Sequence, residues 1–159
     1  MQIQRVQQVQ PWIGRSETEA IEACLERNWL TEGPAAAAFR QNLGQLTGSP
    51  HISFAPNGTL GLFLALLALD LPRGSEIIIP GFTFMASASA AVFAGLKPVL
   101  IDVDPNTFAA RPEAFERAIT SRTSALMPVH IYGQAANAAE IAQLGRRRGL
   151  AVIALDKAQ

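Results

Sequence analysis

Cysteine is almost absent from this chain, since Cys24 is the only one among 159 residues. A single cysteine excludes an internal disulfide and is typical of a protein from a reducing compartment. No apolar run reaches the roughly 18 residues that a membrane span requires, and the longest extends from Leu60 to Leu69. The opening segment, MQIQRVQQVQ, lacks the apolar core of a signal peptide. We therefore expect a soluble, cytoplasmic protein.

The chain also lacks an excess of charge of either sign. Its 13 lysine and arginine residues balance 13 aspartate and glutamate residues, so the formal net charge is zero. The one basic cluster, Arg146 to Arg148, falls at the expected end of a helix, where cations interact favourably with the helix dipole. A nucleic-acid binder usually carries a basic excess or patch. We therefore expect neither nucleic acid nor a membrane as a partner.

The chain contains a regular alternation of apolar segments. Two helices, starting near Ser16 and at Pro34, come first. The pattern then predicts strands at 51–55, 76–80, 98–103, 125–130 and 151–155, separated by helices at 58–69, 84–93, 112–119 and 137–147. This order predicts an α/β fold, a mostly parallel sheet with helices on both faces. The continuously apolar Ile77-Ile78-Ile79 suits a strand covered on both sides.

Two parts of the chain differ in this pattern. Residues 1–48 are expected to form an N-terminal helical segment, and residues 49–159 the first part of an α/β large domain. An α/β domain does not normally stop directly after a strand. We therefore expect the domain to be incomplete at the C-terminus and the chain to be a fragment.

Three segments place polar or aromatic residues after expected strands, where parallel sheets gather their ligands. In the first, Asn57-Gly58-Thr59, Gly58 allows a ligand to approach the backbone closely. The free N–H groups of a helix start favour a phosphate, and the Thr59 hydroxyl could add a donor. An ordinary cap and turn is the alternative interpretation.

The second segment, Phe82-Thr83-Phe84, offers a ring that could stack on a planar group or belong to the core. The third ends in Asp156, directly after an apolar strand. A buried carboxylate requires a partner, which could be a pyridinium N–H, a helix start or a distant cation. Together the segments provide a phosphate cradle, a stacking surface and a ring-nitrogen partner, which are what pyridoxal phosphate (PLP) requires. No G-x-G-x-x-G follows the first expected strand, which argues against a Rossmann-type nucleotide binder.

The order and spacing of several motifs resemble the DegT/DnrJ/StrS family of PLP-dependent nucleotide-sugar aminotransferases. The resemblance extends from about Pro11 to Gln159. The motifs that carry it are PWIG at 11–14, WLTEGP at 29–34, APNGTL at 55–60, EIIIP at 76–80 with FTF at 82–84, KPVLIDVD at 97–104 and MPVHIYG at 127–133.

This resemblance implies PLP-transferase fold type I, similar to aspartate aminotransferase, and a homodimer. It implies that Gly58 and Thr59 bind the PLP phosphate and that Phe84 stacks on the pyridine ring. Asp156 would pair with the ring nitrogen, and Gln159 would lie near the ring hydroxyl.

The activity that the resemblance implies is transamination of a nucleotide-linked keto-sugar, with glutamate as amino donor, in the synthesis of polysaccharide or antibiotic sugars. The Schiff-base lysine of the family lies beyond the chain end, so no catalytic residue is assigned here. Lys157, which stands where the family has a small residue, is not expected to replace it. A sugar dehydratase of the same family, with histidine in place of that lysine, and a non-catalytic PLP-binding protein remain alternatives.

Two further groups have simpler interpretations. His130 follows a strand and is expected to bond to the backbone, with contact to cofactor or substrate as the alternative. Asp102 and Asp104 precede Pro105, and strand-end and turn capping explain them better than a metal does. We therefore expect no metal site.

Overall fold

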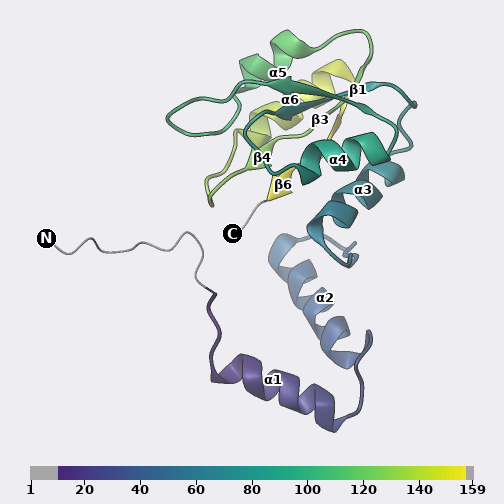
Figure 1. Cartoon of the computed structure of the whole chain (residues 1–159), viewed down its shortest axis with the longest axis vertical. Helices are drawn as coiled ribbons and strands as arrows, with labels where there is room; N and C mark the ends of the chain where they lie inside the picture. Colours follow the sequence, from purple (N-terminus) through teal and green to yellow (C-terminus); the bar gives the residue numbers. More distant parts are fainter. Residues whose placement is uncertain (1–10, 157–159) are drawn as a thin grey trace, which may run out of the picture. The chain divides into compact units, whose positions relative to one another are not determined.

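The computed structural model describes residues 11–156 (Figure 1). The chain divides into two compact units between Phe54 and Ala55. The first unit contains α1 (Arg15–Glu26) and α2 (Pro34–Thr47). Helix α2 starts at a proline, whose missing N–H is not needed in a first turn, and ends at Gly48 with a φ of 69°. Only glycine adopts this left-handed conformation without strain.

The second unit alternates helices and strands. Its elements in chain order are α3 (Gly58–Ala68), β1 (Glu76–Pro80), α4 (Ala86–Phe93), β2 (Lys97–Ile101), α5 (Pro112–Ala118), β3 (Thr123–Leu126), β4 (Val129–His130), α6 (Ala138–Arg148), β5 (Ala151–Val152) and β6 (Leu155–Asp156). Within residues 11–156, no helix is both long and apolar enough to cross a membrane.

The strands form a four-stranded parallel sheet in the order β2-β1-β3-β5, and β4 pairs in parallel with β6. The chain passes from β1 to β2 through α4, and then returns to the other side of β1 through α5. Because such crossovers are right-handed, a reversal of direction puts the helices on opposite faces. Figure 1 shows α3 and α4 on one side of the sheet and α5 and α6 on the other. The predicted fold class is confirmed.

The core has two layers that share β1. Ile77 and Ile79 pack into a cluster with Leu62 and Leu66 of α3, whereas Ile78 faces the opposite cluster, which includes Phe115 of α5. Successive side chains of a strand point to opposite faces. Burial on both faces therefore explains the continuously apolar sequence of β1.

The strand predicted at 125–130 is present but divided. β3 ends at Leu126 and β4 begins at Val129, because Pro128 has no N–H to continue the ladder. The Pro128 carbonyl still accepts a hydrogen bond from the Leu155 N–H at 2.9 Å. β4 and β6 therefore continue the pairing of β3 with β5 towards the carboxyl end.

The strand predicted at 51–55 is wrong. These residues have no regular structure, and no strand among residues 11–156 pairs with them. A β-branched and aromatic composition favours a strand only where a neighbouring strand supplies the hydrogen bonds.

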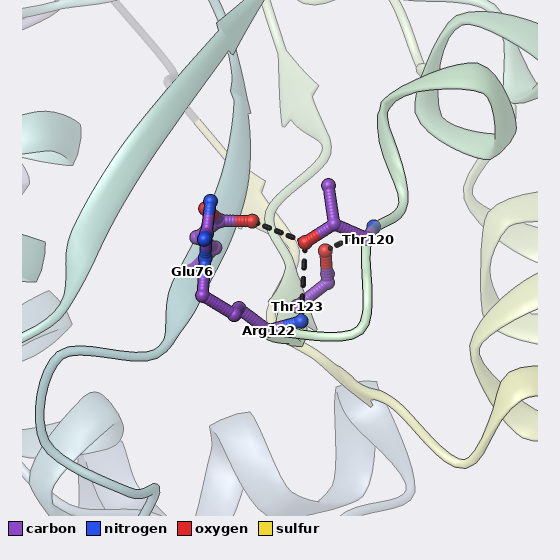
Figure 2. A network of polar contacts seen from close by, with 4 residues as sticks. All are labelled: Glu76, Thr120, Arg122 and Thr123. Atoms are coloured by element: carbon purple, nitrogen blue, oxygen red, sulfur yellow. Dashed lines mark hydrogen bonds and ion pairs between the residues drawn. The ribbon is translucent and has the colours of Figure 1, made fainter.

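A buried polar network fixes the amino end of β1. The Glu76 side chain is only 3% exposed, and its carboxylate accepts hydrogen bonds from the Thr120 hydroxyl at 2.5 Å and from the Arg122 guanidinium at 2.7 and 2.9 Å. Figure 2 shows the Thr120 hydroxyl facing this carboxylate. These bonds, that from Thr120 above all, hold the pKa of Glu76 below its ordinary value of 4.5. The network ties β1 to the loop before β3.

We predict that Glu76→Gln lowers the melting temperature of the chain at pH 7. Because the pKa of Glu76 is depressed by folding, its stabilising contribution is present above pH 4.5 and is lost as the pH falls below that value. The variant should therefore lose less stability than the parent chain between pH 7 and pH 4, as measured by thermal unfolding followed by circular dichroism. Glu113→Gln, at an exposed glutamate of α5, is the control, and equal melting of the two variants at pH 7 would contradict the assignment.

Candidate functional site

The carboxyl ends of the parallel strands form one edge of the sheet, which we call the carboxyl edge. β1 and β3 are neighbours in the sheet. The next helix after β1, α4, and the next helix after β3, α6, lie on opposite faces. Ligands of open α/β sheets bind where the connections diverge in this way. The topology therefore points to the loops that follow β1 and β4.

The amino end of α3 offers two backbone donors. The side-chain oxygen of Asn57 accepts a hydrogen bond from the Leu60 N–H at 3.0 Å, and the Asn57 carbonyl accepts one from the Gly61 N–H at 2.9 Å. Within residues 11–156, the N–H groups of Gly58 and Thr59 have no protein acceptor. A methyl group placed on Gly58 would meet no protein atom within 4 Å. The space and the donors at this helix start fit an anion.

The position of α3 brings this helix start towards the carboxyl edge. The helix ends at Ala68, a short turn before β1 begins at Glu76, so the helix runs back along the sheet in the direction opposite to β1. Its 11 residues span about 16 Å, and the five of β1 span about 17 Å. The two lengths are similar, and Leu62 and Leu66 of α3 share a core cluster with Ile77 and Ile79 of β1.

The two phenylalanines after β1 have different environments. Phe82 contacts Phe108 and Tyr132, with ring centroids 5.2 and 6.1 Å apart. Phe84 is the more exposed of the two, at 54% against 39% for Phe82. Of the two rings that the sequence offered for stacking, Phe84 therefore has the larger area open to solvent.

Phe82, Phe108 and Tyr132, here called the aromatic cluster, were not predicted. Phe108 and Tyr132 lie 6.4 Å apart edge to face and have φ angles of 56° and 53°, a conformation that side chains with a Cβ rarely adopt. Backbone bonds hold both, from Phe108 N–H to the Asp104 carbonyl at 2.7 Å and from Gln134 N–H to the Ile131 carbonyl at 2.9 Å. Such strained backbone is often found at functional sites.

Asp156 lies in β6, directly opposite His130 of β4. It is exposed, so the expectation that it is buried is wrong for the described residues. The reason is that β6 has a neighbour on one side only, β4, among residues 11–156. Its carboxylate is therefore open to a ligand at the carboxyl edge. Gln159 and Lys157 lie outside the described residues.

The simpler interpretations of His130 and Asp104 agree with the structure. The His130 Nδ1 accepts a hydrogen bond from the Ala136 N–H at 2.9 Å. Asp104 accepts one from the Asn106 N–H at 2.8 Å and pairs with Arg111; these contacts, the bond from Asn106 above all, lower the pKa of Asp104. Within residues 11–156, no group of three or more His, Cys, Asp or Glu side chains could hold a metal ion.

Comparison with known proteins identifies the family and the fold. Residues 11–159 match the DegT/DnrJ/EryC1/StrS aminotransferase family. The chain belongs to this family. Several solved structures from the family resemble it closely, among them two that are 32% identical in sequence.

One of these two is NtdA from Bacillus subtilis with bound cofactor PMP (TM-score 0.82). The match covers 89% of the present chain and 34% of NtdA. The other is an aminotransferase from Psychrobacter cryohalolentis (TM-score 0.85), and the match covers 91% of the present chain and 37% of that protein. A third structure, the GDP-4-keto-6-deoxy-D-mannose-3-dehydratase of E. coli with bound hydrated PLP, shares the fold (TM-score 0.83) and is 24% identical in sequence. The match covers 94% of the present chain and 39% of the dehydratase. The chain thus spans between a third and two fifths of the length of these proteins.

We predict that Asn57→Ala destabilises the second unit by about 1 kcal/mol, because the cap of α3 loses its side-chain acceptor. Asn57→Ser, which retains an oxygen at a similar position, should cost less. Denaturant unfolding of the three chains measures the difference. Equal midpoints for the alanine variant and the parent chain would show that the cap contributes nothing.

Proposed function

We propose that this chain is the N-terminal part of a PLP-dependent enzyme that transfers an amino group from glutamate to a nucleotide-linked keto-sugar. One observation carries the proposal. A member of an aminotransferase family has two N–H groups without a protein acceptor at the start of α3, the exposed ring of Phe84 after β1 and the exposed carboxylate of Asp156 in β6. The proposal brings these three groups together at the carboxyl edge.

The amino end of α3 would hold the cofactor phosphate. The N–H groups of Gly58 and Thr59 and the Thr59 hydroxyl are the donors, and the positive end of the helix dipole adds a favourable field. The absence of a side chain at Gly58 lets the phosphate approach the backbone. This argument rests on the open space at Gly58, because no contact within the protein requires a glycine there.

The ring of the cofactor would lie between the ends of β1 and β6. PLP, when bound, supplies a pyridine ring that withdraws electrons from the reacting carbon of the substrate. The Asp156 carboxylate would keep a proton on the ring nitrogen by accepting its hydrogen bond. Phe84 would cover one face of the ring and exclude water from it.

The substrate, the amino donor and the partner subunit are proposed by analogy with the family. Its proton-transferring lysine lies outside this chain, so the chain supplies groups that bind and orient the cofactor. A homodimer would complete the site. The match covers 34% of NtdA.

The proposal is tested by a titration of the 159-residue chain with PLP, followed by absorbance and by borohydride reduction with mass analysis. We expect saturable binding and no adduct on Lys97 or Lys157, the two lysines of the chain. A chain that does not bind PLP at all would contradict the claim that the groups of this chain are sufficient to hold the cofactor. An adduct on either lysine would contradict the assignment of proton transfer to a residue elsewhere.

A matched pair of variants tests the phosphate site. Gly58→Ala should weaken PLP binding about tenfold, because a methyl group then occupies the approach to the backbone and a charge-assisted hydrogen bond is lost. Gly61→Ala is the control, since its methyl group would make an ordinary contact of 3.5 Å with Ala55. Both variants should melt at or above the temperature of the parent chain, because alanine favours a helix. Equal PLP affinity in both would exclude the amino end of α3 as the phosphate site.

A further inference from the structure

The turn between β1 and α4 is held at both ends. At its start, the Gly81 N–H donates to the Ile101 carbonyl of β2 at 2.8 Å. At its end, the Ser87 N–H of α4 donates to the Phe84 carbonyl at 3.1 Å. The intervening residues include the two aromatic residues Phe82 and Phe84.

The central residue of this turn is fixed by one side-chain hydrogen bond. The hydroxyls of Thr83 and Ser87 lie 2.8 Å apart. Ser87 is completely buried, whereas Thr83 is half-buried. Met85, the N-cap of α4, makes no side-chain hydrogen bond to the helix. The hydroxyl pair therefore joins the turn to the first residues of α4, which a capping side chain would otherwise do.

Phe82 is fixed separately. Its ring packs against Phe108 and Tyr132 of the aromatic cluster. These two rings come from the loops after β2 and after β4, so Phe82 is held by elements on both sides of β1 in the sheet. With Phe82 and Thr83 fixed, the direction of the chain at Phe84 is restricted as well.

We propose that Thr83 and Ser87 are positioning residues, which hold the Phe84 ring at the angle at which it stacks on the cofactor. This inference rests on the proposed function, because it takes Phe84 as the stacking ring. Loss of the Thr83 hydroxyl leaves the Ser87 hydroxyl buried without this partner, which favours rearrangement of the turn. Stacking tolerates little rotation of either ring, so a small change at Thr83 alters cofactor binding.

The experiment compares Thr83→Val, which has nearly the shape of threonine and lacks the hydroxyl, with Thr83→Ser, which keeps it. In the ligand-free chain, NMR couplings report the side-chain rotamer of Phe84, and Phe115, which is fully buried, reports the fold. We expect one Phe84 rotamer in the parent chain and in Thr83→Ser, and an average of several in Thr83→Val and in Ser87→Ala. Phe115 should be unchanged throughout.

PLP provides the second measurement. Thr83→Val should bind it about threefold to tenfold more weakly and should show a weaker circular dichroism band from the bound ring, whereas Thr83→Ser should match the parent chain. A parent chain that binds no PLP overturns the claim that this chain alone holds the cofactor, and the rotamer data still decide whether the hydroxyl pair orders Phe84. An ordered Phe84 in Thr83→Val overturns the inference. Unfolding of both Thr83→Val and Ser87→Ala, with Phe115 affected, assigns the pair a purely structural role and also overturns it.

Discussion

Strand β1 pairs with β2 on one side and β3 on the other, and all five of its residues are buried. β1 therefore lies between the strand that follows it through α4, which is β2, and the strand that follows β2 through α5, which is β3. The loops after β1, β2 and β4 consequently end at one edge, with helices diverging to both faces. The aromatic cluster, the Phe82-Thr83-Phe84 turn and Asp156 occupy that edge because the pairing of β1 is fixed. The Glu76 network holds the opposite end of the same strand to the loop before β3.

Local patterns in the sequence were sufficient for much of this architecture. The Ile77-Ile78-Ile79 run, bounded by an Arg73-Gly74 turn and by Pro80, marks a buried strand, and β1 has the predicted bounds. The apolar stretch after Asn57 likewise forms α3 from Gly58 onwards. Both elements are determined by residues close together in the chain.

Features that depend on distant residues were not predictable in this way. The aromatic cluster unites residues 82, 108 and 132, and no local pattern indicates that three loops meet. The one local signal was Tyr132-Gly133 after a strand, which is consistent with a tight turn with two positive φ angles. Residues 51–55 have the composition of a strand and no pairing partner. The apolar residues before Asp156 suggest a buried strand, but β6 pairs only with β4 among the described residues, and Asp156 is exposed.

The family and the geometry together give a consistent description of a binding surface rather than of a complete catalyst. The described residues offer backbone donors, an exposed ring and an exposed carboxylate, which in the proposed function bind and orient a cofactor. They also contain a hydroxyl pair between Thr83 and Ser87 that can keep the ring surface in place.

The central claim is that Gly58, Thr59, Phe84 and Asp156 form one PLP site at the carboxyl edge. The most direct measurement is an NMR titration of the isotope-labelled chain with PLP, which maps the amide shifts and the contacts between the ligand ring and the protein. The account predicts that the amides of Gly58 and Thr59 shift together with the signals of Phe84 and Asp156, with one affinity and with contacts from the pyridine ring to Phe84. Shifts confined to the basic end of α6, at Arg146 to Arg148, or shifts at α3 without any at Phe84 and Asp156, would contradict it.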